Sequence, residues 1–303
     1  MLESGIRRFG RIKVILGPQN GRYPYGNSVL IEDDRTALID PSLLVRELGG
    51  RITKRPIDLV FNSHYHEDHG AGNSLYRNAP LYLHGRDAPA LRSLDTMIEF
   101  YGLEPEAARK FRPLVVDQFH YQAREDIDEL SDGQVFDLGH TRLRVMHTPG
   151  HTGGHCCFFC EQEGVLFVAD CDLTRFGPVY GDRTSGLLEF IESIEKIRRA
   201  GAKTLVSFHE AAIVKDDTQG AIDRYLAVIY QRERTLLDFL VQPRTFNEIV
   251  KRRIIFKKNY DLIWIDSVEG NSMRLHLEKL MAEGSVEFDG QCYYRHRRAQ
   301  EFF

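Results

Sequence analysis

The chain has 303 residues, of which 42% are hydrophobic and 28% are charged, and its formal net charge is −4. These values are those of an ordinary soluble globular chain, long enough for one large domain or for a large domain and a small one. No run of residues is apolar for the length that a membrane span requires, and the segment Met1–Lys13 lacks the apolar core of a signal peptide. We therefore expect a cytoplasmic protein that does not contact a membrane.

Five cysteines are an odd number, which argues against a framework of disulfides. Cys156, Cys157 and Cys160 crowd one apolar segment, and no second pair of cysteines completes a zinc site with them. We interpret them as reduced thiols buried on a strand.

The chain begins with strand-like segments separated by Gly, Pro and Asp-Asp turns. We predict strands at Ile12–Leu16, Ser28–Ile31 and Thr36–Ile39, the last ending at Asp40, then a short helix at Leu43–Leu48 closed by Gly49-Gly50.

A hydrophobic run that ends at Phe61 predicts a buried strand, and the cluster Asn62–Gly70 follows it directly. This cluster contains His64, His66, Glu67, Asp68 and His69. An ordinary hydrophobic core does not require so many histidines and acids. The cluster therefore marks a candidate active-site loop at a strand end.

The middle of the chain alternates predicted strands and helices. We expect a helix to begin in Gly70–Arg77, a strand at Leu81–His84, mainly helical structure from Asp87 to about Phe111 that ends near Pro113, and strands at Val135-Phe136 and Leu143–Met146. The helical insertion carries Met97, Ile98, Phe100 and Tyr101, which either pack in the core or form a lid.

Three later stretches also place histidines or acids at strand ends. The glycine-rich loop His147–His155 contains His151, the strand Val165–Ala169 ends at Asp170, and the strand Thr204–Phe208 ends at His209. If these strands align in one sheet, their ends converge. Imidazole and carboxylate suit zinc, iron or manganese, so His64 and His66 could face one ion with His151, and Asp68, His69 and His209 a second, with Asp170 between them. Two such ions activate a shared water without a side-chain nucleophile.

These motifs together resemble the metallo-β-lactamase superfamily. The similarity rests on His64-x-His66-x-Asp68-His69, on His151 within Thr-Pro-Gly-His-Thr, and on Asp170 and His209, and it covers about residues 10–215. The resemblance implies an α/β fold, a four-layer αββα sandwich with a binuclear metal site at one edge. It also implies that Asp40 supports the first metal-binding loop, and that Asp68 and Asp170 serve catalysis as well as metal binding.

The motifs exclude some branches of the superfamily but do not select a single one. Export signals of secreted β-lactamases are absent, and His66 stands where flavin-linked di-iron members usually have an acid. The Thr-Pro-Gly-His-Thr loop is shared by the glyoxalase II and sulfur dioxygenase branches, and Glu210 after His209 is also seen in glyoxalase II. The loop therefore cannot separate a two-metal hydrolase from a one-iron oxygenase.

A second unit is predicted after the catalytic domain at residues 1–219. Residues 220–303 hold 14 basic against 12 acidic side chains, whereas residues 1–219 hold 26 against 32. The expected elements are a helix at Ile222–Leu240, a second opened by the capping box Thr245–Glu248, a third at Ser272–Glu283, and a hairpin formed by Val286–Phe288 and Cys292–Tyr294. This order resembles a winged helix.

The predicted second unit does not decide which molecule the protein binds. A winged helix after this catalytic domain resembles a branch that contains endoribonucleases for single-stranded RNA and thioesterase-like enzymes, and the segment Asp172–Gly181 is similar to a loop of that branch. The basic residues of the unit either form a solvated face or bind a polyanion; they are Lys251, Arg252, Arg253, Lys257, Lys258, Arg295, Arg297 and Arg298. We expect the unit to pack beside the active site or to form a homodimer contact.

The expected function is therefore a binuclear hydrolase whose metal-bound hydroxide attacks an ester, thioester or phosphodiester, with two divalent ions as cofactors, zinc before iron or manganese. A small-molecule ester or thioester and single-stranded RNA are both candidate substrates. The alternatives are a mononuclear iron sulfur dioxygenase and a winged-helix regulator that binds nucleic acid and has a vestigial metal site.

Several neighbouring side chains have two interpretations. His147 and His155 could donate a proton to the leaving group or serve the structure, and Cys171 is a packed thiol or a group near the metals. Tyr23, Tyr65 and Tyr180 are candidates for substrate contact. Substrate specificity is expected from Tyr23–Asn27, from the insertion around Leu94–Phe111 and from the C-terminal unit.

Overall fold

The computed structural model describes residues 5–210, 213–256 and 263–296. Lys257, Lys258, Arg297 and Arg298 of the predicted basic set lie outside these residues. Within the described part of the chain, no helix is both long and apolar enough to cross a membrane.

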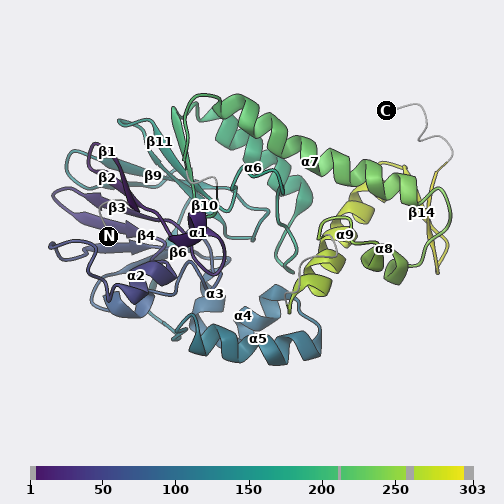
Figure 1. Cartoon of the computed structure of the whole chain (residues 1–303), viewed down its shortest axis with the longest axis horizontal. Coiled ribbons are helices and arrows are strands. Elements are labelled where there is room, and N and C mark those ends of the chain that lie inside the picture. Colours follow the sequence, from purple (N-terminus) through teal and green to yellow (C-terminus); the bar gives the residue numbers. More distant parts are fainter. Residues whose placement is uncertain (1–4, 211–212, 257–262, 297–303) are drawn as a thin grey trace.

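Two β-sheets form the centre of the molecule (Figure 1). The first has seven strands in sequence order: β1 (Ile6–Phe9), β2 (Ile12–Ile15), β3 (Ser28–Glu32), β4 (Thr36–Ile39), β5 (Leu59–Phe61), β6 (Leu81–His84) and β7 (Ile127–Leu130). The second has six strands, in the spatial order β13 (Ile213–Val214), β12 (Thr204–Ser207), β11 (Val165–Ala169), β10 (Cys156–Cys160), β9 (Arg142–His147) and β8 (Val135–Asp137). Both sheets mix parallel and antiparallel pairs.

The sheets pack face to face over a hydrophobic core that both supply. The ring of Phe61 on β5 meets the rings of Phe136 and Phe158 on the second sheet edge to face, with centroids 4.8 Å and 5.5 Å apart. All five residues of β10 and of β11 are buried, as expected for central strands covered on both faces. The three cysteines of β10 are therefore core residues, as predicted.

Helices cover the outer faces and complete the αββα sandwich. On the first sheet these are α2 (Leu43–Glu47), α3 (Ala88–Arg92), α4 (Leu94–Tyr101) and α5 (Pro105–Asp117), and on the second they are α6 (Leu187–Arg199) and α7 (Thr218–Phe239). The turn α1 (Pro18–Gly21) and the 3-10 helix η2 (Asn73–Tyr76) lie in loops. The predicted four-layer fold is thus confirmed.

Several element boundaries differ from the sequence prediction. Helix α5 continues through Pro113 instead of ending there, and Gly70–Arg77 forms only the turn η2. Helix α6 was not predicted, although its buried residues Leu187, Phe190, Ile194 and Ile197 follow helical spacing. Strands β1, β7 and β13 and the turn α1 were not predicted either.

The C-terminal region contains the predicted helices and hairpin, but a winged-helix domain is not evident. Its elements are α7, α8 (Phe246–Arg252), α9 (Ile265–Ala282) and the hairpin of β14 (Val286–Phe288) and β15 (Tyr293–Arg295). The capping box of Thr245 and Glu248 is present. Helix α9, however, begins at Ile265 rather than Ser272, and ten of its 18 residues are buried.

The C-terminal helices share one hydrophobic cluster with α6 and the outer face of the second sheet. In Figure 1 the long helix α7 runs from the sandwich to the hairpin, and α9 returns toward the sandwich. No observation tests the predicted domain boundary after residue 219, which stays a prediction.

A buried hydrogen-bond chain fixes α7 against α9. Arg232 donates to the hydroxyl of Tyr180 (2.9 Å), which donates to Nε2 of His276 (3.0 Å), while Nδ1 of His276 faces Glu233 (3.4 Å). Lys279 also pairs with Glu233 at 3.0 Å. Burial alone would raise the pKa of Glu233, but the hydrogen bonds from His276 and Lys279 lower it below its usual value.

This shift predicts acid-sensitive stability. A carboxylate whose pKa is lower in the folded state stabilises the fold fully above its unfolded pKa of 4.5, and the stabilisation is lost as the pH falls through the folded pKa. We expect the stability advantage of the wild type over Glu233→Gln to be constant above about pH 5 and to shrink below it. Urea unfolding at several pH values measures this advantage. Glu283→Gln, which removes an exposed partner of the same Lys279, should show no such change; a constant difference for Glu233→Gln would contradict the prediction.

Candidate metal centre

The candidate site lies where strand ends from both sheets meet. Strands β4 and β5 are parallel in the first sheet, and β11 and β12 are parallel in the second. Their carboxyl ends carry Asp40, the cluster from Asn62, Asp170 and His209. The expected convergence therefore occurs, but between two sheets rather than along one.

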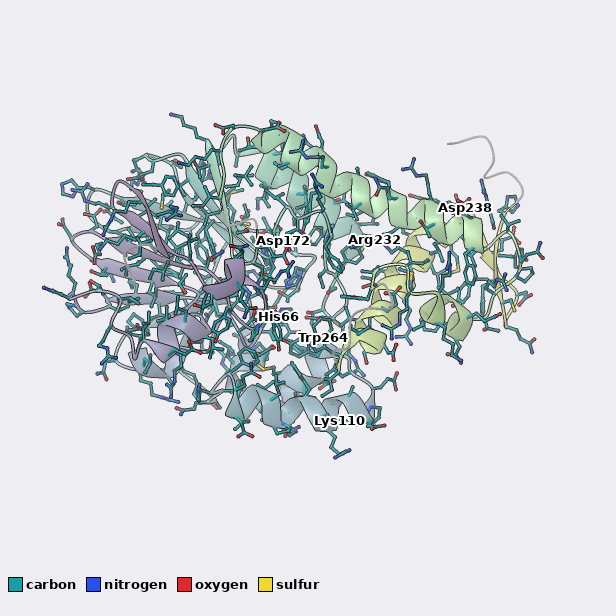
Figure 2. All side chains as sticks on the ribbon, in the orientation of Figure 1. His66, Lys110, Asp172, Arg232, Asp238 and Trp264 are labelled. Atoms are coloured by element: carbon teal, nitrogen blue, oxygen red, sulfur yellow. The ribbon has the colours of Figure 1, made fainter. Side chains whose placement is uncertain are left out.

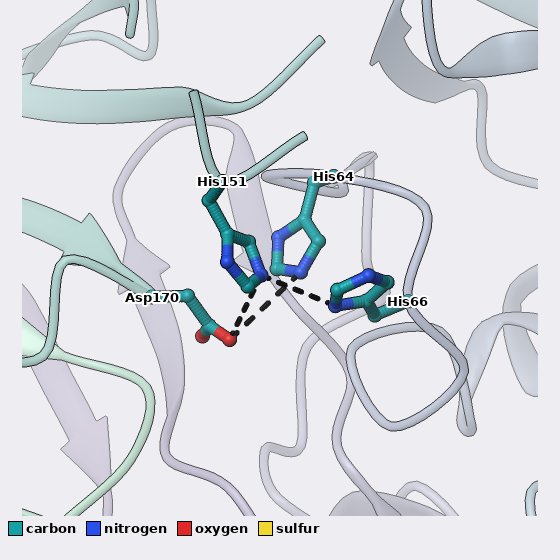
Figure 3. Close-up of side chains that lie close together, drawn as sticks. All are labelled: His64, His66, His151 and Asp170. Atoms are coloured by element: carbon teal, nitrogen blue, oxygen red, sulfur yellow. Dashed lines mark hydrogen bonds and ion pairs between the residues drawn. The ribbon is translucent and has the colours of Figure 1, made fainter. Parts of the chain in front are cut away.

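Seven predicted side chains form two adjoining groups. His64, His66, His151 and Asp170 make up the first group (Figure 3), and Asp68, His69 and His209 the second; within each, one ligand atom per residue lies within 4.8 Å of the others. Asp170 also touches the second group, because its Oδ1 lies 3.0 Å from Nε2 of His69. This geometry is consistent with a binuclear metal site.

Each histidine has one ring nitrogen engaged outside the centre. Nδ1 of His64 contacts Oγ of Ser63 (2.9 Å), and Nδ1 of His69 contacts Asp40 (2.9 Å). The other three partners are the carbonyl of Val179 for His151 (2.8 Å), the carbonyl of Gly21 for His209 (2.7 Å) and the carboxylate of Asp182 for His66 (2.7 Å). A carbonyl or carboxylate oxygen only accepts, so the engaged nitrogen of His66, His69, His151 and His209 carries a proton. The other ring nitrogen then offers its lone pair whenever the imidazole is neutral, as it is when a metal ion binds.

The lone pairs consequently point at one another, which is the arrangement that a metal ion requires. Nδ1 of His66 lies 3.2 Å from Nε2 of His151, and that nitrogen lies 3.3 Å from Asp170. Among the described residues, four buried atoms at the centre have no hydrogen bond of acceptable geometry: His64 Nε2, Asp68 Oδ2, His69 Nε2 and Asp170 Oδ1. Buried acceptors without donors are costly unless a cation satisfies them, so these residues fit a pair of divalent ions.

The electrostatics of the centre also favour bound positive charge. Burial lowers the pKa of His209, but Asp170 and Asp68 more than reverse this and raise it to about 9. Burial also lowers the pKa of His69. The carboxylates of Asp170 and Asp40 outweigh burial and hold this pKa well above its usual value. The carboxylates therefore attract protons when metal is absent and attract metal ions when it is present.

Asp40 ties the first loop to β4. Its Oδ1 accepts from the backbone N–H of Ser63 (2.7 Å), and its Oδ2 accepts from the Ser63 hydroxyl (2.7 Å) and from His69. Asp40, Ala169 and Glu210, each at or beside a strand end of the site, have positive φ values of 48°, 45° and 44°. Side chains other than glycine rarely adopt this conformation, and such strain is concentrated at functional sites.

The loop that presents His151 is fixed by close packing and by one buried acid. At Gly150 φ is +134°, and a Cβ atom there would lie 2.3 Å from Cα of Phe190 on α6. Asp87 accepts from the Thr152 hydroxyl (2.6 Å) and from the Gly154 N–H (2.7 Å). Burial raises the pKa of Asp87 to about 6 despite these hydrogen bonds.

A cavity of about 320 Å³ opens above the two groups. Its floor includes His66, Asp68, His151, Asp170 and His209, and its wall is largely apolar or aromatic: Tyr23, Tyr101, Phe111, Phe176, Val179, Phe256, Trp264 and Val268. Figure 2 shows His66, Asp172 and Trp264 around the same central region, with Trp264 contributed by the C-terminal helices. The C-terminal region thus completes the cavity, as expected for a unit that packs beside the site.

Several candidate residues do not line this cavity. Tyr65 and Tyr180 are fully buried, whereas Tyr23 lines it and donates to Glu67 (2.9 Å). His155 is buried beneath His64, and burial lowers its pKa to about 3. His147 is half-buried and stacks on His84 with centroids 3.9 Å apart.

Cys171 is buried and packs beside Cys157, which confirms the interpretation as a packed thiol.

Sequence reasoning missed three buried acids around the centre. Asp182 bonds His66, Asp87 holds the His151 loop, and Glu67 accepts from the hydroxyls of Tyr23 and Tyr101. Glu67 was counted in the first cluster, but no sequence pattern indicated a role for it. Asp87 and Asp182 stand in loops with no motif spacing to mark them.

The comparisons with known proteins agree with this geometry. The profile of the Metallo-beta-lactamase superfamily matches residues 22–209, which is more than half of the chain.

This chain belongs to the metallo-β-lactamase superfamily.

Two curated superfamily relatives and one solved structure show how far the similarity extends. A beta-lactamase-like protein 2 homolog of Drosophila melanogaster is 27% identical over 77% of this chain and 71% of its own length. An atrochrysone carboxyl ACP thioesterase of Pseudocercospora fijiensis is 26% identical over 92% and 69%. A metallo-beta-lactamase family protein of Thermus thermophilus superimposes with a TM-score of 0.72 at 23% identity, covering 94% of this chain and 99% of that one.

Family membership and the two His/Asp groups together make the protein a metal-dependent hydrolase of the metallo-β-lactamase superfamily. The number and identity of the metals, and the separate roles of Asp68 and Asp170 in catalysis, stay predictions.

Proposed function

We propose that the protein hydrolyses thioesters that carry an apolar acyl group. The observation that carries this proposal is the wall of the cavity, in which Phe111, Phe176 and Trp264 line the same space as the metal-binding residues. Apolar walls with a few convergent polar groups are typical of sites that bind small organic molecules. An acyl chain would lie against this wall with its carbonyl at the floor.

The charges of the cavity disfavour a polyanion. Arg22 is the one lysine or arginine among the described lining residues, and it pairs with Glu210 at 3.1 Å. The remaining charged lining groups, apart from the histidines, are acids, including Asp172 and Asp182. A phosphodiester strand usually needs several cationic side chains along its backbone. The described cavity therefore fits a neutral thioester better than single-stranded RNA.

The chemistry of a thioester also suits this site. When bound, two divalent ions activate a water and stabilise the negative charge that develops on the carbonyl oxygen. The residues that would hold them are the two groups described above, with Asp170 shared. A thiol with a pKa near 8.5 leaves as a thiolate without strong acid assistance. His147 and His155 are not among the described residues that line the cavity, and a thiolate leaving group does not need them as proton donors.

The name of one relative supports the same class of substrate. The Pseudocercospora fijiensis protein is called an ACP thioesterase, and its similarity extends over 92% of this chain.

The proposal is tested by comparing substrates on the full-length protein. Neutral acyl N-acetylcysteamine thioesters of increasing chain length, a fluorescent single-stranded RNA and a persulfide in an oxygen electrode would be assayed with and without chelator. We expect thioester hydrolysis that a chelator abolishes and that divalent metal restores. RNA cleavage without thioesterase activity, or oxygen consumption with the persulfide, would overturn the proposal.

Trp264 should determine how well long acyl groups bind. Its ring contacts Phe256 and Tyr23, with centroids 5.8 Å and 6.4 Å away. Trp264→Ala removes an aromatic surface worth about 2 kcal/mol of contact, so kcat/KM for a long-chain thioester should fall about 30-fold. The acetyl thioester should be affected much less, as should the long-chain substrate with Phe288→Ala, which alters an exposed ring of the hairpin. Equal losses for short and long chains would contradict this role.

A further inference from the structure

Asp182 lies at a junction that belongs to none of the motifs. It stands in the loop between β11 and α6 and is only 7% exposed. Its Oδ2 accepts from the hydroxyl of Tyr65 (2.5 Å) and from Nε2 of His66 (2.7 Å). Its backbone N–H donates to Ser185 (3.0 Å), whose hydroxyl donates to the carbonyl of His151 (2.6 Å). One loop therefore holds two histidines of the first group.

The bond to Asp182 decides which nitrogen of His66 faces the centre. A carboxylate oxygen accepts, so Nε2 of His66 carries the proton and Nδ1 keeps its lone pair. That lone pair points toward His151, because the two nitrogens are 3.2 Å apart. In the other four histidines it is Nδ1 that is engaged outside and Nε2 that faces the centre. His66 is thus turned the opposite way, and Asp182 is the group that turns it.

The two metal groups have parallel supports. Asp40 accepts from His69 in the second group, and Asp182 accepts from His66 in the first. The remaining histidines rest on a hydroxyl or on backbone carbonyls. Each group therefore has one histidine backed by a carboxylate, an arrangement that orients a metal ligand and increases its basicity.

Tyr65 completes the support. Its side chain is fully buried and shares the same Asp182 oxygen. Its ring also packs edge to face on His66, with centroids 4.8 Å apart. Tyr65 therefore fixes both the acceptor and the ring that the acceptor orients.

We infer that Asp182, supported by Tyr65, is a positioning residue that holds His66 with Nδ1 turned toward the group of His64, His66 and His151. It acts through His66 and does not require the thioester proposal to hold. Outer carboxylates of this kind typically contribute 10- to 100-fold to metal affinity.

Metal binding by the full-length chain tests this inference directly. The apoprotein would be titrated with Co²⁺ in competition with a chromophoric chelator, and the visible absorption of the bound cobalt recorded. With Asp182→Asn we expect one of the two ions to bind about 10- to 100-fold more weakly and its cobalt spectrum to change, while the other binds within about threefold of the wild type. Tyr65→Phe should cause a smaller loss at the same ion.

Two comparisons identify the affected ion. Asp40→Asn should weaken the other ion, and the double variant should weaken both. Glu233→Gln is the matched control, because Glu233 is also a buried carboxylate that faces a histidine, His276, and among the described residues it belongs to none of the groups that could hold a metal ion. It should leave both affinities unchanged.

Unchanged cobalt affinity and spectrum in Asp182→Asn would overturn the inference, and so would equal weakening of both ions. If Asp182→Asn does not fold, Tyr65→Phe decides, since it keeps the ring and removes only the hydroxyl. A Tyr65→Phe variant with wild-type binding of both ions would then overturn it.

Discussion

Asp170→Asn should lower the rate of hydrolysis at least about 10³-fold and reduce the metal content of the purified protein. Asp170 Oδ1 lies 3.0 Å from Nε2 of His69, and Oδ2 lies 3.3 Å from Nε2 of His151. The substitution removes the one negative charge shared by both groups. The amide of the asparagine can donate a hydrogen bond to a ring nitrogen of His69 or His151, so that nitrogen is no longer available to a metal ion. The fold should be retained. Metal per chain, measured by elemental analysis, and initial rates give the two readouts.

The thermal midpoint of the metal-free protein separates this effect from unfolding. Metal-free Asp170→Asn should melt moderately below the metal-free wild type, because the amide no longer pairs with His69 and His209, but it should still unfold in one cooperative transition well above the assay temperature. Glu233→Gln, which lies outside the candidate metal groups of the described residues, should keep both metal and activity. Full metal content and activity in Asp170→Asn would show that Asp170 is not shared by two ions.

Glu269→Ala should destabilise the protein by about 3 kcal/mol or more and disturb the cavity wall. Glu269 is fully buried on α9 and accepts from three consecutive backbone N–H groups, those of Ile254 (2.7 Å), Ile255 (3.1 Å) and Phe256 (2.9 Å). Removing the carboxylate takes away the buried oxygens that accept from these three donors. Phe256 lines the cavity, so binding of long acyl chains should weaken together with stability. Chemical denaturation and KM for a long-chain thioester measure the two effects.

Two variants calibrate this prediction. Glu269→Gln keeps the shape and one accepting oxygen, and should show an intermediate loss. Glu278→Ala changes an exposed glutamate of the same helix and should have little effect. If Glu269→Ala is as stable as Glu278→Ala, the segment before α9 does not depend on this carboxylate.

Sequence patterns predicted the floor of the site because its residues are concentrated in short motifs at strand ends. Four of the seven candidate ligands lie in the segment from His64 to His69. Asp170 and His209 each follow a buried strand that its hydrophobic residues predict. The same patterns could not reveal Asp182, which meets His66 across 116 positions in the sequence. A contact of that kind depends on the path of a loop, and local periodicity contains no information about it.

The C-terminal region shows a different limit. The order of three helices and a hairpin was predicted, but the packing that distinguishes a winged helix from another arrangement was not. The first part of α9 escaped prediction because its buried residues include Ser267, Glu269 and Gly270, which do not give an apolar pattern. Their burial follows from contacts with distant segments, such as the bond from the N–H of Glu104 to Ser267 (3.0 Å).

The division of the cavity between floor and wall separates two kinds of evolutionary change. Ligand residues come from the sandwich, whereas Phe256, Trp264 and Val268 come from the last part of the chain. Substitutions at these wall positions can therefore alter which molecules enter the cavity while the residues of the two His/Asp groups stay the same. A lineage that changes the wall residues and keeps the floor would acquire a new substrate with the same reaction.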